Sequence, residues 1–579
     1  MNSLENTSNY FDENFIPGTS KIFESQDSSS IESTRPLKKN KNGIVLLPQP
    51  SDNPNDPLNW SIFRKSWHFI LLSFITALTA AVSNDAGAAQ DSLNKAYGIS
   101  YDSMNTGAGI LFLFIGWSCI VFAPASSLYG RRITYIICLL CGCLGSVWFA
   151  VSRRTADTIW SQAFVGISEA CAEAQVQQSL SDIFFQHQLG SVLTVYILAT
   201  SVGSFLGPLL AHLISAAQGF RWVGWWGAII MGATLVVTIL SCEETVFDRS
   251  KYSTVFEASK SIESEAEIRD EKDVKDDYKD VKEECKDIKE GEFPKEKDQS
   301  TTDEIVSNNF VQDSEAQQEK LIPFHKRIAL ITPSPYLIGS GFKQYVTRFF
   351  VYFKVFTFPA VWLSGILWGL QDAYMTFFLT TQDTFFYDEP WNYTDTGVAI
   401  MNVATLIGAV IGCIVSGILS DYHVLWLAKR NNGIMEPEYR LWLLFITLFI
   451  SPLGLIMFGV GAANNWPWQV IYVGLGFIGF GWGSIGDTAM SYLMDAYPAI
   501  VIQGMVCVSI INNTLACIFT FVCSLWLDHS GTANTYIVLA VIDFVSIAFI
   551  IPTLYYGKTW RKRSKKLYVE LVELTQGMG

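Results

Sequence analysis

Residues 104–125 and 133–151 read MNTGAGILFLFIGWSCIVFAPA and ITYIICLLCGCLGSVWFAV, and the seven residues between them read SSLYGRR. Neither of the two longer stretches contains a charged residue. Each has about the 20-residue length at which an α-helix crosses the hydrocarbon core of a bilayer. Two uncharged stretches joined by a turn with two arginines predict a membrane-spanning helical hairpin.

The same pattern recurs along the chain, which is 50% hydrophobic and only 16% charged. Soluble proteins carry about a quarter of charged residues, so this chain is short of the groups that keep a surface wet. Ten further apolar blocks lie near 67–89, 158–181, 190–215, 222–241, 357–381, 397–419, 440–461, 468–493, 504–527 and 535–556. This pattern excludes a soluble enzyme, a nucleic-acid-binding protein and a secreted disulfide scaffold.

The blocks divide into six plus six around a long hydrophilic segment, which is an internal-repeat signal. We therefore predict an all-α membrane protein with twelve transmembrane helices in two pseudo-symmetric six-helix bundles. The expected regions are a disordered cytosolic N-terminal tail (1–62), an N-terminal bundle (63–242), a charged cytosolic linker loop (243–350), a C-terminal bundle (351–557) and a basic cytosolic tail (558–579).

Most of the net charge of −14 belongs to the linker. Glu243–Lys320 contains 25 acidic and 13 basic residues, which leaves the rest of the chain near neutrality. Segments with interleaved charges and no apolar face stay solvated. The acidic balance therefore describes a linker or regulatory loop and gives no direct information about a ligand.

Basic residues gather on one side of the predicted spans. With the N-terminus inside, the cytosolic segments hold Arg64, Lys65, Arg131, Arg132, Lys429, Arg430, Arg440 and six basic residues of 558–566, and the short outer loops hold only Lys95, Arg153, Arg154 and Arg221. This distribution obeys the positive-inside rule and predicts that both termini are cytosolic. Asn392-Tyr393-Thr394 then lies outside and forms a glycosylation acceptor sequence.

The sequence indicates no metal centre, cofactor or catalytic centre. Ten of the 11 cysteines lie in or at the end of apolar blocks, where small apolar packing explains them better than metal binding. The six histidines are scattered, and no Walker motif is present, so ATP does not drive the protein. We expect no enzyme, no cofactor and no nucleic-acid partner.

Short motifs resemble the major facilitator superfamily. Pro124-Ala-Ser-Ser-Leu-Tyr-Gly130-Arg131-Arg132 looks like its cytosolic gating motif, although Ser127 stands where relatives carry an acid. Gly417-Ile-Leu-Ser-Asp421 is the counterpart in the C-terminal half.

Span 5 reads Gly203-Ser-Phe-Leu-Gly207-Pro208-Leu-Leu-Ala-His212 and resembles the glycine-proline motif of twelve-span drug:proton antiporters. His212 breaks the pair of small residues that usually ends this motif, and Gln162 replaces the family's membrane-embedded arginine in span 4.

Longer stretches look like the yeast permeases for histidinol and polyamines. These are Asn-Asp-Pro-Leu-Asn-Trp (55–60), Ser-Asn-Asp-Ala-Gly-Ala-Ala-Gln-Asp (83–91), Ile-Ser-Glu-Ala-Cys-Ala-Glu-Ala-Gln (167–175) and Tyr-Leu-Met-Asp-Ala-Tyr-Pro (492–498). The resemblance implies a monomeric plasma-membrane transporter of cationic amines that works with protons by alternating access.

Five carboxylates inside the predicted spans are the candidate binding residues: Asp85, Glu169, Glu173, Asp372 and Asp487. An ionised group in a span costs at least roughly 2.5–3.5 kcal/mol, so it normally faces a cavity or a partner. The spans concerned (1, 4, 7 and 10) line the central cavity in this superfamily. Because no cavity-facing lysine or arginine is evident, a cationic ligand is expected and an anionic one disfavoured.

Glu169 and Glu173 are four residues apart, so they share a helix face about 6 Å apart. Two like charges this close favour keeping one protonated, which makes the pair a candidate for proton coupling as well as for substrate binding. The alternative is a pair hydrated by a water-filled vestibule.

Asp372 lies near Trp368 and Tyr374, and aromatic faces suit an alkylammonium group. The alternative is that these aromatic residues only pack against helices.

Two candidates have strong structural alternatives. Glycines surround Asp487, so a hydrogen bond between packed helices would explain it too, and alignment of the repeats puts it beside Glu173. Asp85 could be an exposed residue at the outer end of span 1. Asn512, Asn513 and Asp543 are better explained by helix packing.

Taken together, we expect proton-coupled uptake of cationic amines, with polyamines (spermidine, putrescine, spermine) first and histidinol-like amines second. An exporter of cationic drugs in exchange for protons is the main alternative, because sequence does not settle direction. An amine-sensing receptor that signals through the acidic loop is the alternative from another class.

Overall fold

The computed structural model describes residues 15–21, 46, 50–51, 53–247, 321–334 and 337–577. Most of the predicted charged linker therefore lies outside the described residues. The chain divides into two compact units. The described part of the smaller unit includes the single turn η1 (Pro57–Asn59), which Asp56 caps by accepting a hydrogen bond from the Leu58 amide at 3.0 Å. The larger unit contains every long helix that the structure describes.

The six N-terminal spans are helices, and two of them end at glycines, Gly130 and Gly219. α4 begins after Ser100, whose hydroxyl accepts from the Ser103 amide, and ends at Gly130 with φ +103°, a conformation that favours glycine. The elements are α2 (Ile62–Ser83), η2 (Ala86–Ala89), α3 (Gln90–Tyr97), α4 (Tyr101–Tyr129), α5 (Arg131–Ala150), α6 (Thr155–Ala170), the π-helical turn η3 (Cys171–Val176), α7 (Gln177–Ile183), α8 (Gln186–Gln218) and α9 (Arg221–Ser241).

The C-terminal half repeats this plan. After the short α12 (Phe324–Arg327) and the amphipathic α13 (Phe342–Val355), its elements are α14 (Pro359–Phe385), α15 (Asp395–Ile414), the π-helical turn η4 (Val415–Leu419), α16 (Ser420–Arg430), β2 (Ile434–Met435), η5 (Pro437–Leu443), α17 (Leu444–Ala463), α18 (Trp468–Ala496), η6 (Pro498–Ile500), α19 (Val501–Ser530), α20 (Thr532–Ala548) and α21 (Ile550–Gly577).

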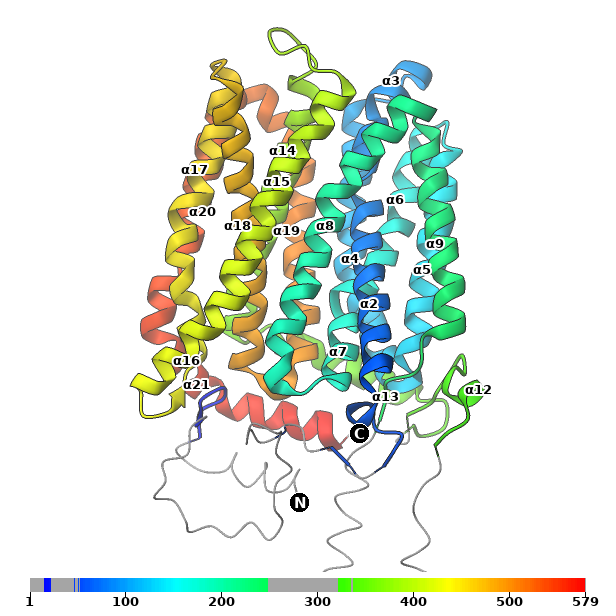
Figure 1. Cartoon of the computed structure of the whole chain (residues 1–579), viewed down its shortest axis with the longest axis vertical. Coiled ribbons are helices and arrows are strands. Elements are labelled where there is room, and N and C mark those ends of the chain that lie inside the picture. Colours follow the sequence, from blue (N-terminus) through cyan, green and yellow to red (C-terminus); the bar gives the residue numbers. More distant parts are fainter. Residues whose placement is uncertain are drawn as a thin grey trace, which may run out of the picture. The chain divides into compact units, whose positions relative to one another are not determined.

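The helices pack in the same order in both halves (Figure 1). Within the N-terminal bundle α2 packs on α8, α4 on α6 and α5 on α9; within the C-terminal bundle α14 packs on α19, α15 on α18 and α17 on α20. The bundles meet where α4 contacts α19 and α8 contacts α15. Spans 1 and 5, 2 and 4, and 3 and 6 are thus paired in each half, which confirms the predicted repeat.

Ten of the twelve predicted spans coincide with described helices that are long and apolar enough to cross a membrane. Span 7 is α14, which follows α13 after a bend of 83°. Span 4 consists of α6, η3 and α7 in direct succession, and the π-helical turn divides it into shorter helices.

Part of the predicted N-terminal tail contacts the C-terminal half, in contrast to the disorder expected for 1–62. β1 (Ser20–Lys21) pairs antiparallel with β2, and the Arg561 guanidinium donates to the Pro17 carbonyl. Arg561 also bonds Glu438 at 2.7 Å and is only 1% exposed. The predicted basic tail is likewise a structured element, because α21 continues as a helix from Ile550 through most of 558–579.

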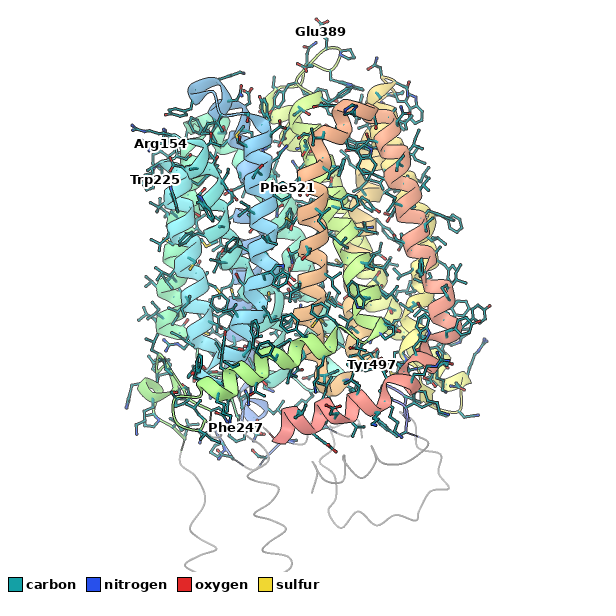
Figure 2. All side chains as sticks on the ribbon, turned by 180° about the vertical axis from the view of Figure 1, so that it is seen from behind. Arg154, Trp225, Phe247, Glu389, Tyr497 and Phe521 are labelled. Carbon is teal, nitrogen blue, oxygen red and sulfur yellow. The ribbon has the colours of Figure 1, made fainter. Side chains whose placement is uncertain are left out.

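Two amphipathic helices cross one end of the bundles. α13 packs on α4 and α19, and α21 contacts η5 and η6 (Figure 2, light green and red helices at the bottom). The face of α13 away from the bundles exposes aromatic side chains, with Phe342 70% and Phe350 62% exposed. This position suits a helix that lies in the membrane interface.

Candidate functional site

A buried cavity lies between the two bundles and brings together four of the predicted binding residues. Glu169, Glu173, Trp368 and Asp372 line it, together with Ser83, Asn84, Leu111, Phe112, Ile115, Thr200, Ser204, Met375, Trp482 and Asn513. The carboxylates come from span 4 of one bundle and span 7 of the other. We call this space the central cavity. Among its described lining residues none is a lysine or an arginine.

The π-helical turn η3 shapes the span 4 side of the central cavity. Glu169 belongs to the last turn of α6 and Glu173 to η3, and both side chains face the cavity. Glu169 and Asp372 lie close enough to Glu173 to repel its charge. π-helical turns occur often at functional sites, and the spacing of two glutamates in the sequence gives no sign of one.

Asp372 is held by an aromatic partner that the sequence does not indicate. The Trp482 indole Nε1 donates a hydrogen bond to Asp372 Oδ1 at 2.9 Å. The rings of Trp368 and Trp482 are 5.0 Å apart, and Phe205 of α8 meets Trp482 edge-on at 5.7 Å. Gly486 leaves room for Trp368, because a Cβ at this position would overlap the indole. One carboxylate and two indole rings therefore form one wall of the central cavity.

Three predicted binding residues lie away from the central cavity. Tyr374 is two residues beyond Asp372, which turns it to another face of α14, and it is 1% exposed. Asp487 is also 1% exposed and packs where η4 approaches, with one carboxylate oxygen 2.9 Å from the position of a Cβ on Gly417. Asp85 is buried just before η2. It lines neither the central cavity nor the second cavity that is described below.

The asparagines of α19 divide between the two roles. Asn513 lines the central cavity while its amide group donates to the Ser509 carbonyl at 2.9 Å. Asn512 is fully buried and backs on Gly369 of α14. Asp543 accepts a hydrogen bond from Gln371 at 2.9 Å, which fits the structural role predicted for it.

A second space, the outer cavity, adjoins the central cavity on the outer side. The two share Ser83, Asn84, Leu111, Phe112 and Met375, and the outer cavity also reaches Gln162, His212 and Asp383. The volume open to the centre of a water molecule is about 30 Å³ in the central cavity and about 90 Å³ in the outer cavity. Since one water needs roughly 10–15 Å³ by this measure, only a few waters fit, and a larger ligand requires the bundles to move apart.

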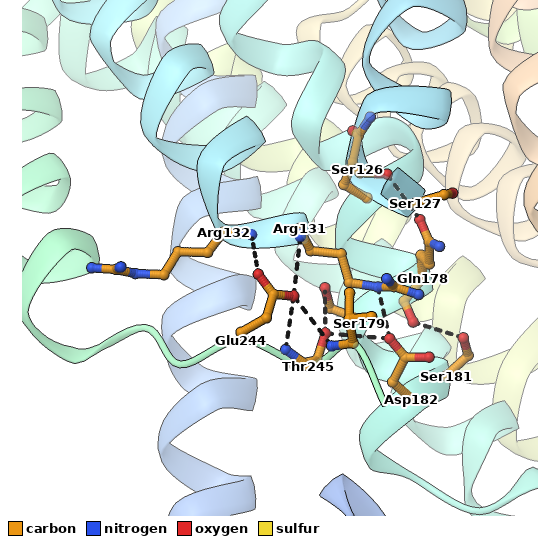
Figure 3. A network of polar contacts seen from close by, with 12 residues as sticks. Ser126, Ser127, Arg131, Arg132, Gln178, Ser179, Ser181, Asp182, Glu244 and Thr245 are labelled. Atoms are coloured by element: carbon orange, nitrogen blue, oxygen red, sulfur yellow. Dashed lines mark hydrogen bonds and ion pairs between the residues drawn. The ribbon is translucent and has the colours of Figure 1, made fainter. Parts of the chain in front are cut away.

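Charged residues of the two predicted gating motifs form ion-pair networks at the end of the bundles that α13 and α21 cross. Arg131 Nε pairs with Asp182 Oδ2 at 2.7 Å (Figure 3). Glu244, which follows α9, accepts hydrogen bonds from the backbone amides of Arg131 and Arg132 at 3.0 and 3.1 Å. Glu244 therefore caps α5 at the motif in which Ser127 replaces the usual acid.

The C-terminal half has the matching network. Arg440 pairs with Asp421 at 2.9 Å and also with Asp495. In each network an arginine at or before the start of a span therefore pairs with an aspartate at the end of another span, span 4 in the N-terminal half and span 10 in the C-terminal half.

The glycines of span 5 permit close helix contact, as their spacing predicts. A Cβ on Gly203 or Gly207 would overlap the backbone of Ala77 or Ala81 in α2. Pro208 lies within α8 and its carbonyl faces His212. Asn392 of the predicted glycosylation sequence is exposed in the loop after α14.

Two six-helix bundles that meet around a buried polar cavity inside the membrane define a membrane transporter. The chain belongs to the Major Facilitator Superfamily, whose model matches residues 69–522. This confirms the resemblance found in the sequence motifs, and it places the protein among transporters rather than enzymes.

Two relatives match almost the whole chain. Protein HOL1 of Saccharomyces cerevisiae is 55% identical over 575 residues, which cover 97% of this chain and 98% of the relative. An uncharacterized MFS-type transporter of Schizosaccharomyces pombe is 48% identical over 96% of this chain and 94% of its own length. An MFS transporter of Aspergillus oryzae is 24% identical over 77% of this chain and 78% of its own length.

Proposed function

We propose that the protein imports cationic amines together with protons, with polyamines as the preferred substrates and histidinol-like amines second. The observation that carries this proposal is the central cavity, where Glu169, Glu173 and Asp372 converge beside two indole rings. Its described lining contains no basic side chain. A polyvalent cation is the ligand class that supplies the missing positive charge.

The cavity matches both parts of an alkylammonium chain. Carboxylates accept the N–H groups of the ammonium ends, and the faces of Trp368 and Trp482 can contact methylenes as well as the cation. An anionic substrate would add a charge to a site that already holds three acids. Because each buried charge costs several kcal/mol unless it is paired, such a substrate is disfavoured on energetic grounds.

The driving force we propose is the membrane potential together with a proton gradient. An inside-negative potential favours cation import by about 2.3 kcal/mol per charge and 100 mV. Glu173 shares the central cavity with Glu169 and Asp372, and neighbouring like charges disfavour its ionised form, so it is the proposed proton carrier. The protein would act at the plasma membrane as a monomer, with both termini in the cytosol.

Export of cationic drugs in exchange for protons is the second candidate, because the tight contact of Gly203 and Gly207 with α2 reproduces the antiporter motif. An amine-sensing receptor would use the same cavity without net flux.

The test is uptake of labelled spermidine into liposomes that contain the purified full chain. We expect accumulation driven by an inside-alkaline gradient and competition by putrescine, spermine and histidinol. Efflux-only activity would support the exporter, and binding without flux would support the receptor. If the protein binds neither labelled spermidine nor labelled histidinol, the proposal is overturned.

A further inference from the structure

The outer cavity contains an ion pair between the two bundles. His212 of α8 and Asp383 of α14 face each other, with 3.3 Å between Nε2 and Oδ1. Their side chains are 4% and 12% exposed. His212 is the residue at which the sequence departs from the small pair that ends the span 5 motif, so the ion pair depends on this departure.

The surroundings of His212 determine its protonation. Nδ1 lies 2.8 Å from the Pro208 carbonyl, which can only accept, so Nδ1 carries a hydrogen. Nε2 faces a carboxylate oxygen, which also accepts unless it is protonated. Both ring nitrogens therefore face acceptors. The contact is favourable only when His212 and Asp383 share one additional proton, beyond the hydrogen that a neutral imidazole already carries. Loss of this proton leaves two lone pairs facing each other.

No other charge lies in the outer cavity to replace that proton. Among its described lining residues, His212 and Asp383 are the only ionisable groups; α2, η2, α3, α4, α5, α6 and α19 contribute neutral side chains. Three acids that are adjacent in sequence to lining residues, Asp85, Asp91 and Asp157, do not line the cavity themselves. The amides of Gln90, Asn105 and Gln162 offer further hydrogen-bond acceptors.

The outer and central sites lie along one face of α14. Asp372 and Asp383 are eleven residues apart, which is close to three full helical turns and places them about 16 Å apart. The cavities that contain them share five lining residues. This separation is close to that of the two end ammonium groups of a long extended polyamine such as spermine, whereas successive ammonium groups, only three or four methylenes apart, lie much closer together.

We propose that Asp383 is an outer binding site for an amine, at which the substrate's ammonium group and the proton on His212 compete. This inference rests on the proposed amine transport. With the proton in place, the ion pair joins α8 to α14 and holds the outer side closed. An ammonium group can replace the proton, because its N–H groups can donate both to Asp383 and to the lone pair that the departing proton leaves on His212 Nε2. This replacement also breaks the ion pair that joins the two bundles.

The first arm of the test measures equilibrium binding of labelled spermidine to the full chain in lipid nanodiscs between pH 7.5 and 5.5. Because the proton on His212 competes with the ammonium group, we expect binding to weaken on the order of tenfold toward the lower pH. We expect this weakening to be largely lost in His212→Gln, and Asp383→Asn to bind more weakly at every pH. His529→Gln and Asp388→Asn are matched controls, since both residues are exposed and line neither cavity.

The second arm keeps both residues of the pair and measures access to the outer cavity. Leu379→Cys places a thiol in its wall, and its labelling by an impermeant thiol reagent is compared with that of Asp388→Cys in the outer loop. We expect the labelling ratio to rise with pH and with added spermidine.

The outcomes of the two arms are separable. If the wild-type chain binds no spermidine, the proposed function fails. A labelling ratio that does not depend on pH then also overturns the proposal that the His212–Asp383 ion pair holds the outer side closed. If spermidine binds but His212→Gln keeps the full wild-type pH dependence, the competition at Asp383 is overturned while the central site stands.

Discussion

The Trp482 indole donates a hydrogen bond to the Asp372 carboxylate across the contact between α18 and α14. The bond orients one carboxylate oxygen and leaves the rest of the group facing the central cavity. It also brings a second ring beside Trp368, 5.0 Å away. The indole thus holds the carboxylate at the wall of the central cavity, where it is placed for binding.

Replacement of Asp372 by asparagine should abolish amine uptake without loss of the folded protein. The amide can still accept the Trp482 hydrogen bond, but it cannot pair with an ammonium group. An unpaired charge in a buried site costs about 3–5 kcal/mol, which corresponds to at least a roughly hundredfold loss of affinity. Spermidine binding and surface abundance are the two measurements, with Asp388→Asn as the control.

Asp487→Asn provides a comparison within the same bundle. Because Asp487 packs against the Gly417 region outside the central cavity, its replacement should change affinity much less than that of Asp372. Equal losses in both variants would contradict the assignment of Asp372 as the main cation ligand.

The fold could be predicted from the sequence because each span can be recognised from its own residues alone. A run of about 20 apolar residues is readable without knowledge of its neighbours. Asp372 and Trp368 could be predicted together for the same reason, since a spacing of four puts them on one helix face. Charge inside a span then marks that face as the functional one.

The rest of the site depends on contacts between distant segments. Trp482 reaches Asp372 from another helix, and nothing in its own stretch distinguishes it from a packing residue. Likewise, Asp383 gains its partner His212 only when the bundles meet. Rotation about a helix also separates residues that are adjacent in sequence, so Tyr374 turns away although it lies two positions from Asp372.

Loss of the Glu244 cap should weaken the cytosolic end of the N-terminal bundle. Its carboxylate accepts from the Arg131 and Arg132 amides, which are the unpaired donors at the start of α5. Removal of an N-terminal cap costs about 0.5–2 kcal/mol, so Glu244→Ala should lower the melting temperature of the detergent-solubilised protein. Glu244→Gln retains an acceptor oxygen and should lose less; an unchanged Glu244→Ala protein would contradict the capping role.

Removal of Arg561 should detach the N-terminal segment from the C-terminal bundle. Its guanidinium bonds Glu436 and Glu438, both at most 9% exposed, and it also holds the Pro17 carbonyl. Arg561→Ala leaves two buried carboxylates without this partner, so we expect a loss of about 3–5 kcal/mol in stability. Arg563→Ala, two residues on at an exposed position, should be neutral in the same thermal assay.

The same cluster predicts a dependence of stability on pH. Burial by itself raises the pKa of Glu436, but hydrogen bonds from Lys558 and Arg561 outweigh it and hold the pKa below its ordinary value. A carboxyl group whose pKa is lowered by folding stabilises the protein at pH values above its unfolded-state pKa of about 4.3. This stabilisation is lost as the pH falls through the folded-state pKa. Glu436→Gln should therefore flatten the fall in melting temperature below that pH.

Deletion of residues 263–318 should leave transport intact in liposomes. The deletion removes no apolar block and no carboxylate of either cavity, and it spares Glu244 and α12. Uptake by the purified deletion protein is compared with that of the full chain at equal reconstitution. Loss of flux in liposomes would show that the loop takes part in transport, whereas loss confined to cells would indicate a role in trafficking or regulation.

Replacement of Glu173 by glutamine should separate substrate binding from proton coupling. Glutamine resembles the protonated carboxyl and cannot release a proton, so the gradient can no longer drive accumulation. Exchange of internal for external spermidine needs no net proton movement and should partly survive. Uptake and counterflow are measured side by side from pH 5 to 8, with Glu169→Gln as the matched variant on the same cavity wall. A Glu173→Gln protein that still concentrates spermidine with wild-type pH dependence would move the coupling role elsewhere, to Glu169 first because it lines the central cavity and then to Asp85.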